Sequence, residues 1–261
     1  MTEQPTFAPS ILPAVYEPIP RSIVLAAWAN CWIDGSCSAD DITQALDTFG
    51  PQRFLAPSDA GTPATGLLIG LSDLGLRPGS GIARLRVVLP TAGDPFGLAG
   101  PPAVNKEAIA VGQAIIADDE GVTLLPLVNE SVTTWTAFRT PVGALPAMAI
   151  RPELAAAAVK RALLDATAAL ADLDLAAGRD GAAELLMELN TRLKRVKLPA
   201  SLPGTAQHTI HSAAQILGIC EIALATARPA LTTNLDRQRR SVLTELATTA
   251  RHCLAAAVSP R

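Results

Sequence analysis

Aromatic side chains are scarce in this sequence. Three tryptophans, one tyrosine and five phenylalanines are spread over 261 residues, and none of them lies in residues 151–261. Proteins that bind single-stranded nucleic acid stack bases on aromatic rings beside basic side chains. The two basic runs, 192–197 and 237–240, have no such rings near them, and the net charge is −3. We therefore do not expect nucleic acid as a partner. The basic runs are expected to face solvent or the acidic first part of the chain.

No apolar run is long enough to cross a membrane, although the mean hydropathy is +0.30. The most apolar stretch, residues 22–33, is interrupted by Asn30 and followed by Asp34, whereas a spanning helix needs about 20 apolar residues. The first ten residues contain Glu3 and no Lys or Arg, unlike a secretory signal. We expect a cytoplasmic protein that does not associate with membranes.

The cysteines form no standard disulfide or metal pattern. None of the four belongs to a C-x-x-C pair, and Cys31, Cys220 and Cys253 lie in apolar helical patterns, so we expect reduced thiols in the core. The glycine-rich nucleotide-binding fingerprints and the G-x-S-x-G nucleophile motif are also missing. No cofactor is expected, and the sequence favours a role other than catalysis.

The two halves of the chain differ in charge and composition. Residues 1–150 hold 14 acidic and 7 basic side chains and most of the prolines and glycines. Residues 151–261 hold 10 acidic and 14 basic side chains and long alanine-rich patterns. Such asymmetry indicates separate lobes. We predict a proline-rich arm over residues 1–20, an α+β lobe over 21–150 and a four-helix lobe over 151–261.

Hydrophobic periodicity predicts a small mixed sheet with helices in the first lobe. Ser22 is a candidate N-cap, and Trp28 and Trp32, one turn apart on the helix that follows, are expected core residues. Ser38 and Asp41 form a capping-box pattern. The predicted helices span residues 22–33, 38–50, 65–76 and 105–117, and the predicted strands span 51–57, 82–89, 122–128 and 132–138.

The second lobe contains four helical patterns with short connections, which favour an antiparallel bundle. Pro152 and Glu153 suit the first turn of a helix. The Glu-x-x-His pairs of di-iron bundles are missing. The predicted helices span residues 152–177, 182–197, 205–227 and 232–258. The predicted fold class is therefore α+β, with a sheet-containing N-terminal lobe and an antiparallel helical bundle at the C-terminus.

The most distinctive loop, residues 90–104, follows the predicted strand at 82–89. It contains three glycines, an Asp-Pro turn signal and a double proline, and it leads into a predicted helix. A strand, a glycine-rich loop and a helix can bring backbone N–H groups to an anion, but an Asp before Pro also initiates ordinary turns. The structural role is the simpler interpretation. The candidates for ligand binding are Gly93, Asp94, Gly97 and Lys106.

The three histidines fall on two predicted helices. His208 and His211 are neighbours on one helix surface, and an antiparallel partner helix would bring His252 and Cys253 to the same level. Imidazoles and a thiolate are zinc ligands, so His208, His211 and His252 are the candidates for a metal site. Nearby positive charge, such as Arg251, opposes a cation. An anion or an acidic partner at this end is the preferred alternative.

One stretch resembles a known group of proteins. Residues 89–101 read LPTAGDPFGLAGP and precede an alanine-rich helix and a helical second half. This pattern resembles uncharacterised actinobacterial proteins that share a strand, an LPxxGDPxGLxGP loop and a helical C-terminal half. The resemblance covers most of the chain and implies the two-lobe layout. It implies no activity and transfers no catalytic residue.

The function that these observations favour is a non-catalytic interaction or regulatory module, with another protein or a second copy of the chain as its partner. The alternative is a small-molecule- or anion-binding protein or enzyme, in which residues 90–104 form one wall of an interlobe cleft. A deep pocket that holds Asp94 and basic residues would favour the alternative. A tightly closed interface between the lobes, with the Asp94 side chain capping its own turn, would favour the interaction module.

Overall fold

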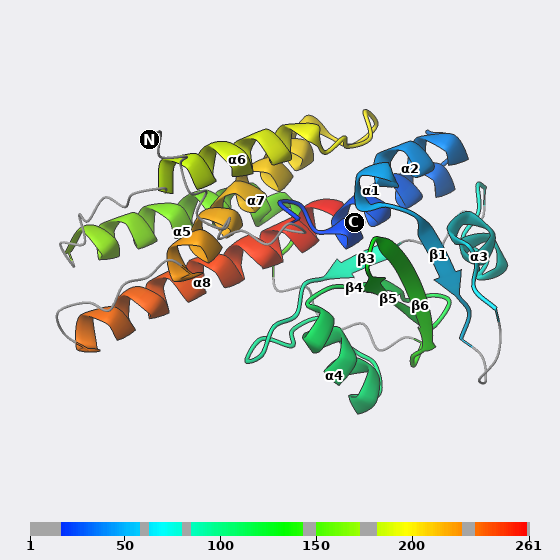
Figure 1. Ribbon diagram of the computed structural model, residues 1–261, viewed down its shortest axis with the longest axis horizontal. Helices are drawn as coiled ribbons and strands as arrows, with labels where there is room; N and C mark the ends of the chain where they lie inside the picture. The colour runs from blue at the N-terminus through cyan, green and yellow to red at the C-terminus, as the bar shows by residue number, and fades with distance from the viewer. Residues whose placement is uncertain are drawn as a thin grey trace, which may run out of the picture.

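The computed structural model describes residues 17–57, 63–79, 85–142, 150–172, 182–225 and 233–259. The long helices of the second half lie on one side, and a six-stranded sheet with shorter helices lies on the other (Figure 1). The architecture is α+β, as the sequence predicts. Most of the predicted arm over residues 1–20 lies outside the described residues. The helices are α1 (Arg21–Ile33), α2 (Ala39–Leu46), α3 (Leu67–Asp73), α4 (Pro102–Val111), α5 (Pro152–Asp172), α6 (Ala182–Arg195), α7 (Gly204–Ala225) and α8 (Thr233–Val258), with a 3-10 turn, η1 (Asp47–Phe49).

The sheet is mixed, with the strand order β2-β1-β6-β5-β4-β3. β1 runs parallel to β6, and the other neighbouring strands are antiparallel. This pairing confirms the mixed sheet expected from the sequence. The strands are β1 (Gln52–Leu55), β2 (Thr65–Gly66), β3 (Leu85–Val88), β4 (Ala114–Ala117), β5 (Val122–Asn129) and β6 (Val132–Arg139).

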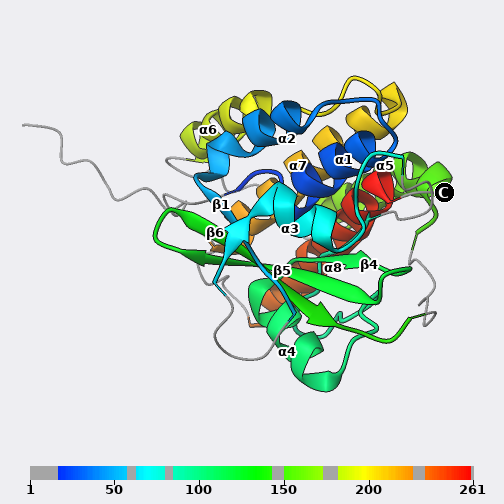
Figure 2. The same cartoon turned by 90° about the vertical axis from the view of Figure 1, so that its right-hand side faces the viewer.

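Helices cover both faces of the sheet, because successive side chains of a strand point to opposite faces. On one face, Val88, Ile116 and Leu125 cluster with Ala108 of α4. On the other face, the alternate side chains of the same strands join the main core, which lies under α1, α3 and the end of α8. Figure 2 shows the sheet between α4 and these helices.

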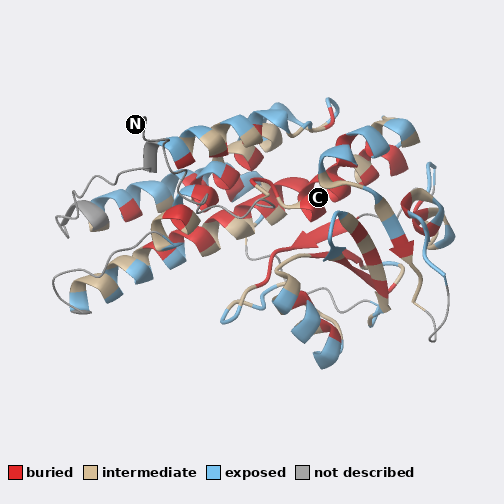
Figure 3. Cartoon of the chain, viewed as in Figure 1, coloured by how far each residue is buried: buried red, intermediate tan, exposed pale blue. Residues whose placement is uncertain are grey.

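α1 lies at the centre of the molecule. Every residue of the helix except Trp28 and Asn30 is buried, and it contacts α2, β3, β4 and α8. Trp32 is buried, which confirms it as a core residue, whereas Trp28 is partly buried and packs against the edge of the main core. Figure 3 shows the buried residues gathered where α1 meets the C-terminal end of α8.

The two predicted helix starts in the first half have different outcomes. Ser38 caps α2 with the reciprocal Asp41 bonds of a capping box, and these bonds from Ser38 lower the pKa of the Asp41 carboxyl. The cap predicted at Ser22 is wrong, because α1 begins one residue earlier, after Pro20. Proline fixes φ near the helical value, and the Pro20 carbonyl accepts from the Ile23 N–H at 2.9 Å.

The helix predicted over residues 105–117 is wrong in its second half. α4 ends at Val111, because Gly112 adopts a left-handed φ of +75° and its N–H bonds the Ala108 carbonyl, which is a common glycine stop. The chain then re-enters the sheet as β4, all of whose residues are buried. Alanine and isoleucine on both sides of Gly112 fit a helical pattern. Burial on both faces of a central strand also permits such an uninterrupted apolar run.

The helical half is a three-helix core with a fourth helix attached. α8 packs along both α5 and α7, and α5 also packs on α7, whereas α6 packs on α7. The helix bounds agree with the four predicted helical patterns, although residues 173–177, 226–227 and 232 of those patterns lie outside the described residues. None of the described helices is long and apolar enough to span a membrane.

Gly70 marks a close approach between α3 and β1. A Cβ atom built on Gly70 would collide with the ring of Phe54, which is a buried side chain of β1. Glycine inside a helix normally destabilises it relative to alanine. The sequence pattern at Gly70 is thus explained by packing, since only glycine allows this helix to lie against the strand.

We expect Gly70→Ala to lower the free energy of unfolding by about 1–3 kcal/mol, because the added methyl group must displace the Phe54 ring. Urea denaturation followed by circular dichroism measures the change. Gly204→Ala is the matched control, since a Cβ atom at Gly204 meets nothing within 4 Å. Equal midpoints for Gly70→Ala and the unsubstituted protein would contradict the close approach.

Candidate functional site

The loop between β3 and α4 forms a tight turn at Asp94. The Thr91 N–H donates to the Asp94 carbonyl at 3.0 Å, and the Asp94 N–H donates to the Thr91 carbonyl at 2.9 Å. Gly93 has a φ of +90°, which glycine adopts without strain. The turn expected from the Asp-Pro signal is present, and it leaves the Asp94 side chain available for a contact outside the loop.

The side chains of Asp94 and Phe96 contact His252 of α8. Asp94 Oδ2 lies 2.7 Å from His252 Nε2, and the Phe96 and His252 ring centroids are 5.9 Å apart. Oδ2 is buried and accepts no hydrogen bond of standard geometry from the described residues, so the contact with His252 is a close approach of a carboxylate and an imidazole. We call this contact of Asp94, Phe96 and His252 the clasp. It joins a loop of the first half to a helix of the second, and the loop lies below α8 in Figure 1.

Arg86 of β3 holds the same loop from below. Its side chain is largely buried, and Nη1 donates to the Gly97 carbonyl at 3.0 Å. Nε and Nη2 donate to the two carboxylate oxygens of Asp118 at 3.0 and 3.1 Å. A bidentate pair fixes the guanidinium plane, so the loop is anchored to the sheet as well as to α8. Sequence reasoning missed Arg86, because a charged residue within a strand carries no signal of its partner.

The predicted ligand residues do not all come together. Gly93, Asp94 and Gly97 share the loop, whereas Lys106 is an exposed residue of α4. The hollow beside the clasp, lined by Arg86, Phe96 and His252 among others, holds about 30 Å³. That volume is about the share of a single water molecule. The loop in this arrangement has a structural contact and little space for a ligand.

The three histidines have three separate partners. His252 contacts Asp94, while His208 Nε2 lies 3.4 Å from the Ser212 hydroxyl and His211 Nδ1 lies 2.9 Å from the Gln207 carbonyl. Within the described ranges, no three His, Cys, Asp or Glu side chains are grouped so that they could hold a metal ion. His252 thus joins the predicted loop site rather than the other two histidines.

Three of the four thiols are poor nucleophiles. Burial raises the pKa of Cys253 to about 12 and the pKa of Cys220 to about 11. Burial and the neighbouring Cys31 thiol raise the pKa of Cys37 to about 12. Because the thiolate is the reactive form, these side chains stay protonated and inert near neutral pH. The Cys253 thiol therefore does not act as an activated nucleophile beside His252.

A pocket of about 570 Å³ lies where the two halves meet. Its walls come from α1, the first turns of α5 and α7, the loop before α7 and the end of α8. Cys31, Ala156, Leu202, Thr209 and Ser259 represent these five segments in the lining. The loop 90–104, expected to form one wall of an interlobe cleft, contributes no residue to it. The sequence carried no signal for this pocket, because its walls are ordinary helical residues.

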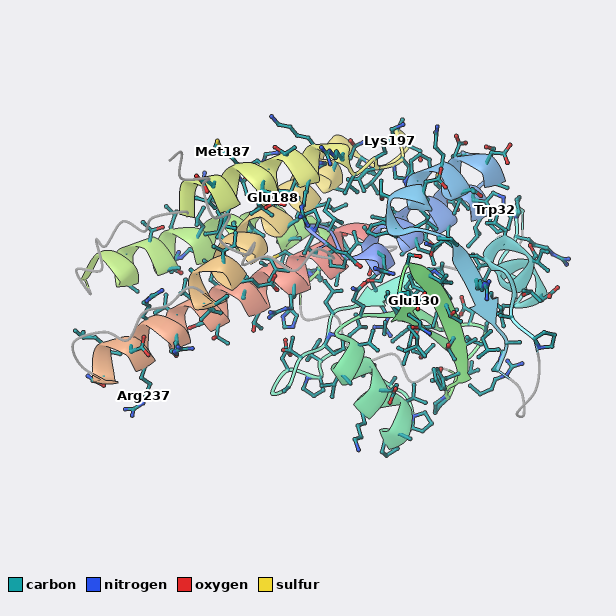
Figure 4. All side chains as sticks on the ribbon, viewed as in Figure 1. Trp32, Glu130, Met187, Glu188, Lys197 and Arg237 are labelled. Atoms are coloured by element: carbon teal, nitrogen blue, oxygen red, sulfur yellow. The ribbon has the colours of Figure 1, made fainter. Side chains whose placement is uncertain are left out.

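A second hollow of about 510 Å³ lies between the end of α6 and the β5–β6 turn. Arg192 and Arg195 of the basic run 192–197 line it together with Glu17 and Glu130 of the acidic first half. Figure 4 labels Glu130 on the hairpin and Lys197 beyond the end of α6. The Lys197 carbonyl also accepts from the Trp28 indole N–H at 3.0 Å. Arg192 and Arg195 thus lie beside acidic residues of the first half, while Lys194, Arg195 and Lys197 are exposed.

We expect His252→Gln and Asp94→Asn each to destabilise the protein by about 1 kcal/mol, because each removes one partner of a close, partly buried contact between a carboxylate and an imidazole. The two substitutions should be less than additive in a double-mutant cycle. Urea denaturation gives the stability terms, and hydrogen exchange should quicken at residues 91–97. His208→Gln is the control on an exposed helix face. If the two substitutions were additive and exchange at residues 91–97 did not quicken, the clasp would contribute nothing to the stability of the fold.

The buried thiols predict a loss of stability at alkaline pH. A thiol in the unfolded chain ionises with a pKa of about 8.5, whereas Cys253 stays protonated up to about 12 in the fold. The unfolded state therefore loses its proton first, and the free energy of unfolding falls as pH rises above about 8.5. Cys253→Ala should reduce this slope between pH 8.5 and 10.5 in urea titrations. If the free energy of unfolding fell equally steeply with pH in both proteins, the raised pKa of Cys253 would be contradicted.

Two family models match consecutive parts of this chain. The model for the Rv1486c-like protein N-terminal domain matches residues 22–153, and the model for the C-terminal domain matches residues 154–255. The loop with the clasp aspartate lies in the first match and His252 in the second. No solved structure matches the chain.

Mycobacterial proteins are among its relatives. Uncharacterized protein MT1533 of Mycobacterium tuberculosis (strain CDC 1551 / Oshkosh) is 29% identical over 259 residues, which cover 84% of this chain and 88% of that protein. Uncharacterized protein Rv1486c of strain ATCC 25618 / H37Rv is 37% identical over 108 residues, or 36% of this chain and 38% of that protein. These relatives confirm the resemblance to an actinobacterial family. The chain belongs to the family of Rv1486c-like proteins.

Proposed function

We propose that this protein binds a small molecule between two lobes, residues 21–150 and 151–261, without transforming it. The observation that carries the proposal is the pocket of about 570 Å³. Ligand pockets commonly enclose about 300–1,000 Å³ and often lie between domains, with mostly apolar walls and a few polar groups. The walls here fit that description, since alanine, proline and leucine side chains alternate with hydroxyl groups.

A binding role is supported over a catalytic one by the chemistry of the described residues. Catalytic sites bring together a nucleophile or an acid–base pair with room for a substrate. The clasp pairs a carboxylate with an imidazole, but the hollow beside it has a volume of about 30 Å³. Three of the thiols have raised pKa values. We also place the protein in the cytoplasm, because its four cysteines are free thiols and such thiols persist in reducing compartments.

The second candidate function is a protein-interaction module with a partner protein or a second copy of the chain. Exposed apolar side chains on the helical half favour it: Leu163 and Leu164 of α5, Met187 of α6 and Ile219 of α7. Met187 lies on the outer side of α6 in Figure 4. These side chains lie on three helices of the same half, and exposed apolar side chains mark an interaction surface where they form one patch.

Native mass spectrometry of gently purified protein, beside its denatured mass, tests the proposal. We expect a mass excess that is lost on denaturation. Ala156→Phe should abolish that excess, because Ala156 is an exposed residue at the pocket wall and a phenyl ring there occupies the pocket. Ala157→Phe is the matched control, since Ala157 is also exposed on α5 and does not line the pocket.

The outcomes separate the two functions. An excess retained in Ala156→Phe would place the ligand elsewhere and overturn the pocket proposal. A ligand-free dimer or a protein complex in the same spectrum would favour the interaction module. Loss of the excess in both variants would indicate a change in α5 as a whole rather than occupation of the pocket.

A further inference from the structure

The pocket between the lobes has an unusual side-chain composition, which restricts the ligand. None of its described lining residues is Lys, Arg or His, and none is aromatic. An anion would therefore enter without a cationic side chain to pair with, and a buried unpaired charge is costly. A nucleobase or other aromatic ring would find no ring on which to stack.

The charged groups of the lining do not reverse this conclusion. The acidic residues Asp34 and Glu153 line the pocket, and both are exposed. Because solvent screens exposed charges, a cationic ligand would gain little from pairing with them. The first turns of α5 and α7 and the last turn of α8 also meet here. Helix starts and ends carry partial charges of about half a unit with opposite signs, so they partly offset one another.

The hydroxyl groups of the lining determine which hydrogen bonds a ligand can make. Thr209 Oγ1 donates to the Thr205 carbonyl at 2.8 Å, and Ser259 Oγ donates to the Ala255 carbonyl at 2.7 Å. A hydroxyl has a single hydrogen, so both groups have only acceptor lone pairs left for a ligand. The amide of Asn30 is likewise engaged with Leu85 and Val258. At Thr209 and Ser259, a fitting ligand must therefore supply the hydrogen-bond donors.

We infer that the pocket takes an uncharged aliphatic molecule that donates hydrogen bonds, such as an alcohol, a polyol or a primary amide. The inference rests on the proposed function and names the class of its ligand. The apolar wall residues, among them Ala156 and Leu202, would cover the aliphatic part. Thr209 and Ser259 would accept from its hydroxyl or amide groups. Anionic metabolites, nucleotides and flat aromatic cofactors are excluded from the class.

A set of six-carbon probes of equal length tests the charge preference. The probes are hexane-1,6-diol, adipate and hexane-1,6-diammonium, with adenosine as an aromatic probe. Binding is followed by saturation-transfer and protein-observed NMR. We expect the diol to bind and to shift signals of residues around Thr209 and Ser259. The shifts should vanish in Ala156→Phe and remain in Ala157→Phe.

A threonine substitution tests the acceptor role. Thr209→Val keeps the shape of the side chain and removes its oxygen, so the diol affinity should fall about two- to tenfold, the usual effect of one hydrogen bond. Thr191→Val is the matched control, because the exposed Thr191 hydroxyl makes the same bond to a carbonyl one turn back, that of Met187 at 2.8 Å. The control should leave the affinity unchanged.

The results distinguish this inference from the proposed function. If adipate, the diammonium or adenosine bound in the pocket in preference to the diol, the inferred ligand class would be wrong. The proposed function, a ligand-binding pocket, would still be supported. An unchanged diol affinity in Thr209→Val would overturn the acceptor role. Absence of binding by every probe would overturn the inference, and the native mass spectrum of the purified protein would then still decide whether the pocket carries some other ligand.

Discussion

The arrangement of the two halves depends on one amide side chain, that of Asn30. Its Nδ2 donates to the Leu85 carbonyl at 3.0 Å and to the Val258 carbonyl at 3.4 Å, and its Oδ1 accepts from the Leu85 N–H at 2.8 Å. A partly buried amide needs these partners, since an unsatisfied one costs free energy. Asn30 is therefore satisfied only when α1, β3 and the end of α8 are all in place. The sheet and the helical half meet around this residue.

The remaining contacts between the halves follow from that arrangement. With the end of α8 held against β3, His252 lies above the loop that leaves β3, where Asp94 and Phe96 contact it. Arg86 keeps the loop in position through Gly97 and Asp118. The same meeting of helix ends, α1 and α8 with the starts of α5 and α7, encloses the pocket. The loop thus serves as a structural link, and it contributes no residue to the pocket.

Part of the site could be predicted from the sequence. The turn at Asp94 was recognisable because aspartate before proline and glycine at a positive φ have local causes. The prediction that His252 would group with His208 and His211 was a hypothesis about neighbouring helices, and the structure gives each its own partner. Asn30 attracted notice only as a polar interruption in an apolar run. Its three hydrogen bonds depend on strands and helices that are distant in the chain.

The sequence by itself determined the helical and extended segments, because periodic burial, capping pairs and glycine stops act over a few residues. The prediction of β4 as the second half of a helix was wrong, since an Ala-Ile-Ile-Ala run suits a buried strand as well as a helix. Only the tertiary structure decided which polar side chains meet and where space remains. Those outcomes depend on how helices from both halves pack at once, and small alanine side chains leave the pocket between them without any local pattern that marks it.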